Sequence, residues 1–281
     1  MIDIAISFYT LADEKAPLPT GGDWLETAVR EAARKAPDFI CLPEMFCCPY
    51  RTEVFPAYAE EAGGHVWEFC SHLAKEYGVW LIAGSMPEKD RVGNIYNTSF
   101  VFDRQGNQAA RCRKAHLFDV SIEGGQRFRE SDTLSPGNEI TVFDTEFGKM
   151  GLCICYDLRF PELIRLMALK GALAVFVPAA FNPTTGPAHW ELLFRSRAVD
   201  NQIFMAGIAP ARNPQGPYLS WGHTLAADPW GNIIGELGTD PGTLQVTFDL
   251  DMLQRVRREL PLLTQRRQDL YSLLPASPKP E

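Results

Sequence analysis

The chain of 281 residues lacks the features of exported and membrane-spanning proteins. Its first residues contain no basic region followed by an apolar core, and no apolar run approaches the length needed to cross a bilayer. Basic residues are in the minority, because 27 lysines and arginines stand against 35 aspartates and glutamates, for a net charge of −8. The sequence therefore predicts a cytoplasmic protein with neither a nucleic acid nor a membrane as partner, while leaving room for a local basic pocket that binds a small anion.

The chain also lacks the cysteine and histidine spacings of metal sites. Cys47 and Cys48 are adjacent and Cys153 and Cys155 alternate, so neither pair gives the Cys-x-x-Cys ligand spacing of a zinc site. Seven cysteines are an odd number in a chain too long to need disulfide bonds for stability. We therefore expect reduced thiols and neither a metal nor an organic cofactor.

No linker or low-complexity segment divides the chain, and 46% hydrophobic with 22% charged residues is an ordinary globular composition. Short apolar runs that read as strands alternate with helical patterns, which predicts an α/β fold built from crossover units on a largely parallel inner sheet. The expected strands include residues 39–42, 79–83, 149–155, 173–177 and 203–209, and the expected helices include 161–170 and 189–200.

One turn sequence, Asp-x-x-Gly-Asn, occurs at residues 103–107 and 228–232, each time between two predicted strands of a hairpin. Its recurrence in the two halves predicts a single, internally pseudo-symmetric domain over residues 1–260. Residues 261–281 become proline-rich, and we expect this extension to pack on the domain or on a partner subunit.

Cys155 lies where a predicted buried strand gives way to the loop before a helix that begins at Pro161. Backbone N–H groups at such a turn are open to a molecule bound beside the sulfur. Most buried cysteines are inert, so this position alone does not establish a nucleophile.

Two charged residues also follow predicted strands, Glu44 after residues 39–43 and Lys114 after residues 110–113. Ligands bind at the carboxyl edge of open α/β sheets, where both could meet Cys155. A lysine beside sulfur favours thiolate and stabilises an oxyanion, and a glutamate can accept the thiol proton. The simpler reading of each is a solvated charge. His116 is the best histidine candidate for a base, but it is more simply a hydrogen-bonding loop residue.

Three segments carry a family resemblance. Leu42-Pro-Glu-Met-Phe46, residues 113–119 and residues 151–162 together resemble the signature segments of the nitrilase superfamily of carbon–nitrogen hydrolases. The resemblance implies a four-layer α-β-β-α sandwich that hydrolyses carbon–nitrogen bonds. It also implies roles for individual residues: Glu44 as general base and acid, Lys114 and the backbone N–H of Tyr156 as oxyanion donors, Cys155 as nucleophile, and Glu130 as a second carboxylate.

Further segments, residues 116–119, 180–191, 197–202 and 221–223, resemble the omega-amidase branch of that superfamily. This branch hydrolyses the terminal amide of α-ketoglutaramate and α-ketosuccinamate to the dicarboxylate and ammonia through a cysteine thioester. Such a substrate needs a cation for its carboxylate. Arg159 is the candidate, with Tyr50, Phe118 and Thr185 lining the pocket; alternatively, Arg159 forms a structural ion pair with Glu162 or Asp157.

Two alternative functions stay open at this point. The first is a sister specificity, an amidase for deaminated glutathione or a broader aliphatic amidase. The second is a non-catalytic interaction protein on the same fold, which the presence of Glu44, Lys114 and Cys155 disfavours. The resemblance also implies a homodimer or larger homo-oligomer, packed through the helix at residues 161–170.

Overall fold

A computed structural model describes residues 1–8, 23–121, 127–216 and 218–274 of the chain. The first half builds one sheet of seven strands with three helices. In this sheet β1, β2 and β3 run parallel, while β5 and β6 add antiparallel strands at one side. Its elements are β1 (Ile2–Phe8), α1 (Asp23–Ala33), β2 (Phe39–Cys41), α2 (Phe55–Tyr58), α3 (His65–Tyr77), β3 (Trp80–Ile82), β4 (Met86–Lys89), β5 (Ile95–Phe102), β6 (Gln108–Arg113) and, from the end of the chain, β15 (Gly242–Phe248).

The second half builds a sheet of six strands. A small hairpin and a short 3-10 helix come first: β7 (Asp119–Ser121), β8 (Arg127–Arg129) and η1 (Glu130–Asp132). The sheet and its helices follow: β9 (Thr141–Thr145), β10 (Gly148–Leu152), η2 (Cys155–Arg159), α4 (Pro161–Leu169), β11 (Ala174–Pro178), α5 (Gly186–Asn201), β12 (Phe204–Ile208), β13 (Leu225–Ala227) and β14 (Ile233–Glu236). The last helix, α6 (Leu250–Glu259), begins after Asp249, whose carboxylate accepts hydrogen bonds from two backbone N–H groups.

The two sheets repeat one strand order, which confirms the predicted pseudo-symmetry. The first sheet contains the series β15-β1-β2-β3-β5-β6, and the second contains β9-β10-β11-β12-β13-β14. In each series an antiparallel strand is followed by three parallel strands and then two antiparallel ones.

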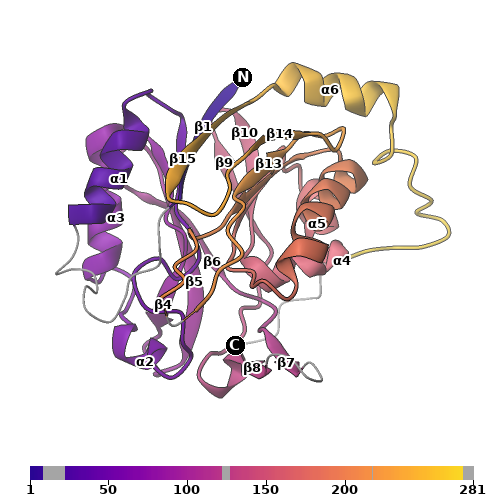
Figure 1. The fold of residues 1–281 in the computed structure, drawn as a ribbon. Helices are drawn as coiled ribbons and strands as arrows, with labels where there is room; N and C mark the ends of the chain where they lie inside the picture. The colour runs from indigo at the N-terminus through magenta and orange to yellow at the C-terminus, as the bar shows by residue number, and fades with distance from the viewer. Residues whose placement is uncertain (9–22, 122–126, 217, 275–281) are drawn as a thin grey trace.

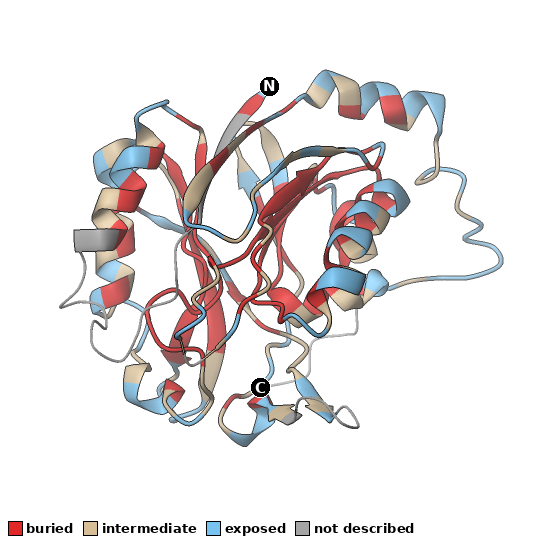
Figure 2. Cartoon of the chain, in the orientation of Figure 1, coloured by how far each residue is buried: buried red, intermediate tan, exposed pale blue. Residues whose placement is uncertain are grey.

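The sheets face each other between two helix layers, with α1 and α3 on one outer side and α4 and α5 on the other (Figure 1). This is the predicted α-β-β-α sandwich. Aromatic rings fill the space between the sheets: Phe39 of β2 stacks on Phe176 of β11 with ring centroids 5.3 Å apart, and Phe204 stacks on Phe248 at 4.4 Å. Both faces of the central strands are covered, which explains their unbroken apolar sequences (Figure 2).

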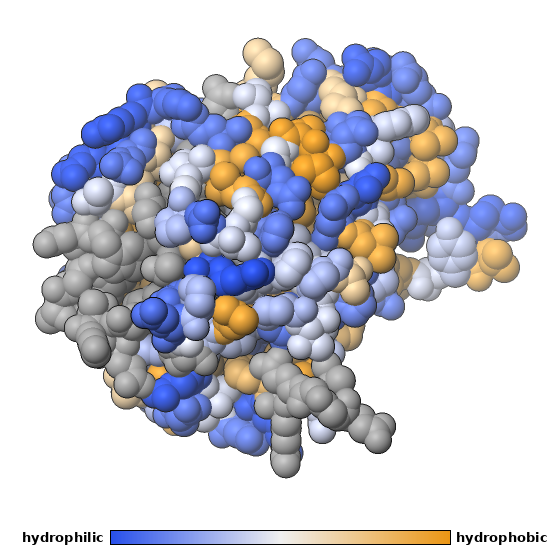
Figure 3. Space-filling model, viewed as in Figure 1, coloured by the Kyte–Doolittle hydropathy of each residue, from blue (hydrophilic) through white to orange (hydrophobic). Residues whose placement is uncertain are grey.

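On the face shown in Figure 3, the layer that contains α1 is strongly hydrophilic, while apolar side chains gather in the upper part of the view beside α6. No helix in the described ranges is both long and apolar enough to cross a membrane. All seven cysteines are free thiols, as predicted.

The Asp-x-x-Gly-Asn turns have the expected hairpin geometry, but the chain contains a third copy. In the turns that begin at Asp103 and Asp228, the aspartate Oδ1 accepts the backbone N–H groups two and four residues later. Asp90, between β4 and β5, makes the same bonds at 3.0 and 2.9 Å. Two of the three copies lie in the first half, so the strand order and not the turn establishes the pseudo-symmetry.

Two predicted boundaries are wrong by three residues each. The strand expected at residues 149–155 ends at Leu152, and Cys155, which takes a positive φ of 47°, starts η2. The helix expected at residues 189–200 begins three residues earlier at Gly186, with Pro187 in its first turn, where the missing N–H costs nothing. The expected C-terminal extension starts after α6, and its residues 275–281 lie outside the described part.

Candidate active site

Cys155 occupies a sharp turn between β10 and η2. Its φ of 47° is unusual for a residue other than glycine. Its side chain is 7% exposed, on the floor of a pocket. Backbone that is strained in this way tends to occur at functional sites.

Glu44, Lys114 and Glu130 form a charged cluster that is fully buried. Glu44 follows β2, Lys114 follows β6, and Glu130 begins η1 after the β7–β8 hairpin. The Lys114 Nζ lies 3.1 Å from Glu44 Oε1 and 2.8 Å from Glu130 Oε1. The three predicted strand-end and loop charges therefore meet in one ion network.

Each carboxylate is held by further donors. Glu44 Oε1 accepts the Asn97 side-chain amide at 2.8 Å, and Glu44 Oε2 accepts the Ala180 backbone N–H at 2.8 Å. Glu130 Oε2 accepts the Phe118 N–H at 2.8 Å, and its Oε1 accepts the Tyr50 hydroxyl at 3.3 Å. These bonds fix both carboxylates around the ammonium and leave little freedom to rearrange.

The cluster and burial shift the pKa values of the site. Burial disfavours the lysine charge, but Glu130 and Glu44 outweigh it and raise the pKa of Lys114. Burial also raises the pKa of Glu130, against the effect of Lys114. The pKa of Cys155 is raised well above its usual value by burial and by Glu44, while Lys114 and the Ala180 backbone act in the opposite direction. The thiol is therefore protonated near neutral pH, and its attack on a substrate requires a base.

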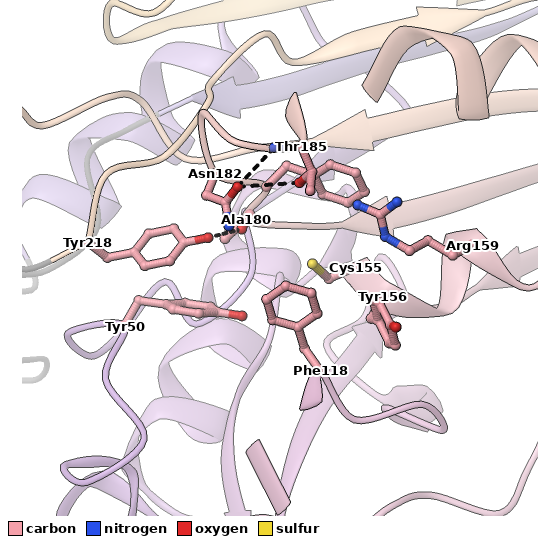
Figure 4. Close-up of a pocket in the computed structure, with 10 residues that line it drawn as sticks. Tyr50, Phe118, Cys155, Tyr156, Arg159, Ala180, Asn182, Thr185 and Tyr218 are labelled. Atoms are coloured by element: carbon pink, nitrogen blue, oxygen red, sulfur yellow. Dashed lines mark hydrogen bonds between the residues drawn. The ribbon is translucent and has the colours of Figure 1, made fainter. Parts of the chain in front are cut away.

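A pocket that Cys155 helps to line lies beside the charged cluster. The five residues predicted to contact substrate all line it, together with residues that the sequence did not indicate (Figure 4). The predicted ones are Tyr50, Phe118, Tyr156, Arg159 and Thr185, and the others are Ala180, Phe181, Asn182 and Tyr218.

The pocket has two chemically different ends. In Figure 4 the Arg159 guanidinium lies on one side of the Cys155 sulfur, and the rings of Tyr50 and Tyr218 lie on the other. The tyrosine rings pack with centroids 4.5 Å apart, and the Tyr218 hydroxyl donates to the Ala180 carbonyl at 2.5 Å. A molecule over Cys155 would thus meet a cation at one end and aromatic surface at the other.

Arg159 makes no ion pair with Asp157, Glu162 or another carboxylate in the described ranges, so the structural alternative for this residue is wrong. Its Nη1 lies 3.0 Å from His189 Nδ1, and its guanidinium lies 4.7 Å from the centre of the Phe181 ring. An arginine is always a donor, which makes His189 Nδ1 the acceptor. Burial lowers the pKa of Arg159, but a guanidinium remains charged at neutral pH. The Arg159 cation therefore lines the pocket without a carboxylate partner among the described residues.

Several residues of the site could not be predicted from the sequence. Ala180 acts through its backbone N–H, and Tyr218 enters from the long connection between β12 and β13. Asn97 is a fully buried amide within β5, where the polar residues Thr98 and Ser99 follow it and are also buried, so nothing in the sequence of this strand sets Asn97 apart. His116 proves to be a hydrogen-bonding loop residue, as expected, with Nδ1 2.7 Å from Asp157 Oδ1. Among the described residues, no three His, Cys, Asp or Glu side chains gather in a metal-binding group.

Comparison with known proteins places this geometry in a family context. The profile of the family described as carbon–nitrogen hydrolase matches residues 15–258. An omega-amidase of Xenopus laevis is 46% identical over 245 residues, which cover 87% of this chain and 88% of the relative.

Solved structures of similar proteins have the same fold. A Saccharomyces cerevisiae protein described as a member of branch 10 of the nitrilase superfamily has a TM-score of 0.84 and 39% identity, covering 95% of this chain and 96% of its own. An amidase of Nesterenkonia has a TM-score of 0.75 and 25% identity, covering 96% of this chain and 95% of its own. In that amidase the acetamide moiety of fluoroacetamide is covalently attached to the active-site cysteine.

Proposed function

The chain belongs to the carbon–nitrogen hydrolase family, and on that premise we propose that it is an omega-amidase that acts on small amides carrying a distal carboxylate, such as α-ketoglutaramate and α-ketosuccinamate. The observation that carries this proposal is the placement of Arg159, without a carboxylate partner in the described ranges, in the same pocket as Cys155. The similarity to the omega-amidase of Xenopus laevis over most of both chains supports it.

Acylation starts from a protonated thiol, since burial and Glu44 raise the pKa of Cys155. Glu44 accepts the proton as the sulfur attacks the amide carbon. The oxyanion of the tetrahedral intermediate is held by the Lys114 ammonium and the backbone N–H of Tyr156. Glu44 then delivers the proton to the amide nitrogen, the carbon–nitrogen bond breaks, ammonia leaves and a Cys155 thioester remains.

Deacylation repeats these roles with water. Glu44 takes a proton from water as the oxygen attacks the thioester, Lys114 and Tyr156 again hold the oxyanion, and the thiolate leaves and regains its proton. Glu130 touches Lys114 at 2.8 Å and fixes the ammonium in place for both steps. The net reaction converts the amide and water to the dicarboxylate and ammonia.

The similarity to an omega-amidase of Xenopus laevis over 87% of this chain favours a small omega-amide over deaminated glutathione as the substrate. The intact cluster of Glu44, Lys114 and Cys155 argues against a non-catalytic interaction protein.

We expect Arg159→Met to raise the KM for α-ketoglutaramate by roughly 10–100-fold, because an arginine–carboxylate hydrogen bond contributes about 1.5–3 kcal/mol. The KM for a neutral amide of the same length, such as pentanamide, should change little. Ammonia release measured on both amides checks this. Arg195→Met is the matched control, since Arg195 pairs with Glu191 on the exposed face of α5.

An equal effect of Arg159→Met on the acidic and the neutral amide would contradict the carboxylate assignment. Faster turnover of a glutathione-like amide than of α-ketoglutaramate by the unmodified protein would overturn the substrate class itself.

We also propose that the protein is cytoplasmic and forms a homodimer. The outer layer of α4 and α5 exposes Leu169, Leu192 and Val199, which a second copy packed through α4 would cover. Seven free thiols suit a reducing compartment. The extension at residues 261–281 would then pack on the domain or on the second subunit, with Leu270 and Tyr271 as its exposed apolar contacts.

A further inference from the structure

Asp157 is a buried carboxylate that the proposed reaction does not use. It lies in η2, two residues after Cys155, and is 1% exposed. A charge buried to this degree is costly unless donors surround it. The carboxylate is therefore maintained by specific contacts.

Those contacts come from two different segments. Asp157 Oδ2 accepts the backbone N–H of Ile154 at 3.1 Å and lies 3.4 Å from the N of Ala115. Asp157 Oδ1 accepts the backbone N–H of His116 at 2.8 Å and lies 2.7 Å from His116 Nδ1. An ionised carboxylate only accepts, so His116 Nδ1 carries the proton.

The two segments are the ones that carry the reacting groups. Ile154 immediately precedes Cys155 and belongs to the second sheet's side of the site. Ala115 and His116 immediately follow Lys114, which leaves β6 of the first sheet. One carboxylate thus joins the nucleophile turn to the lysine segment across the space between the sheets.

The nucleophile turn needs such a restraint. Cys155 has a φ of 47°, which is unfavourable for a side chain other than glycine and persists only when surrounding contacts enforce it. The Asp157–Ile154 bond closes the turn around Cys155. The His116 ring is itself fixed, because it stacks on Phe160 with centroids 3.6 Å apart and planes 9° from parallel.

We infer that Asp157 is a positioning residue that holds Cys155 in register with Lys114, with His116 as its second point of attachment. This inference rests on the proposed function where kcat for the amide is measured. The rate at which Cys155 is alkylated tests it without that function. Asp157 does not line the pocket and does not act on the substrate.

The main test is Asp157→Asn, a change of one atom that puts an NH₂ group against backbone donors. We expect kcat for α-ketoglutaramate to fall ~100-fold, the scale of loss that follows a small misplacement of reacting groups. KM should stay nearly constant because the pocket lining is unchanged. Alkylation of Cys155 by iodoacetamide, followed by mass spectrometry of the peptide that contains it, should slow as well. Asp228→Asn is the matched control, a 4% exposed aspartate that closes the β13–β14 turn.

A second pair of variants covers the case in which Asp157→Asn does not fold. His116→Leu removes the side-chain donor but keeps the backbone bond, and we expect about a tenfold loss of kcat. His116→Asn places an amide N–H near the position of Nδ1, and we expect it to restore most of that loss.

Equal kcat and equal alkylation rates in Asp157→Asn and Asp228→Asn would overturn the inference, as would equal loss in His116→Leu and His116→Asn. If the unmodified protein releases no ammonia from omega-amides while Asp157→Asn still slows alkylation of Cys155, the proposed function fails and the positioning role stands.

Discussion

Cys155→Ala lowers kcat for α-ketoglutaramate by at least ~10⁴-fold, the loss expected when a covalent nucleophile is removed and only binding and oxyanion stabilisation remain. Cys153, two residues earlier, cannot replace it, because this residue is 1% exposed in the hydrophobic core and does not line the pocket. Ammonia release under saturating substrate measures the effect.

Cys153→Ala is the matched control for that experiment. It removes one sulfur from the core and should cost about 1 kcal/mol of unfolding free energy while leaving kcat nearly unchanged. Appreciable turnover by Cys155→Ala, or a comparable loss of kcat in Cys153→Ala, would contradict the assignment of the nucleophile.

Lys114→Met produces the second large effect, on both stability and activity. The substitution leaves the Glu44 and Glu130 carboxylates fully buried without the ammonium that lies 3.1 and 2.8 Å from them. Removing one partner of a buried ion pair costs about 3–5 kcal/mol, and losing an oxyanion donor costs roughly 10²–10³-fold in kcat. Urea unfolding and ammonia release measure the two losses.

The stability loss should depend on pH. Burial already raises the pKa of Glu130 in the presence of Lys114, and removing the cation raises it further. A carboxyl group with a raised folded pKa destabilises the protein only above its unfolded pKa of about 4.3, by an amount that grows until the pH reaches the folded pKa and is constant above it. The difference between the original protein and Lys114→Met should therefore shrink as the pH falls toward that value.

Lys149→Met is the control for this second experiment. Lys149 pairs with Asp144 at 2.7 Å, but the two side chains are 44% and 80% exposed, so the pair should contribute only about 0–1 kcal/mol. A loss of unfolding free energy in Lys114→Met no larger than in Lys149→Met would show that the buried network is not what the structure indicates.

Much of the site could be predicted because its charged residues directly follow strands. Glu44, Lys114 and Cys155 lie within three residues of the carboxyl ends of β2, β6 and β10, and ligands bind at such ends in open α/β sheets. The strands belong to two sheets, so their meeting also depends on how the sheets pack. The apolar strand sequences and the recurring Asp-x-x-Gly-Asn turn predicted strands alternating with helices in one pseudo-symmetric domain, whereas the four-layer sandwich was implied by the family resemblance. Strands, helices and turns depend on residues close together in the chain, so their patterns can be recognised in the sequence.

The remaining contacts depend on how distant segments meet. The backbone N–H of Ala180 donates a hydrogen bond to Glu44, and a backbone donor cannot be predicted from the type of side chain at that position. The approach of His189 to Arg159 depends on the packing of α5 against η2. The Asp157 contacts with His116 cross from one sheet to the other. The β10 strand ends at Leu152, although its apolar sequence continues to Cys155, where the positive φ occurs.

The central claim is that amide hydrolysis proceeds through a thioester on Cys155. The most direct measurement is mass spectrometry of protein quenched with acid during turnover of α-ketoglutaramate, with the modified peptide located by fragmentation. The account predicts an adduct with the mass of the substrate less ammonia, attached to Cys155 and removed by hydroxylamine. An adduct on another residue, or none while ammonia is being released, would contradict it.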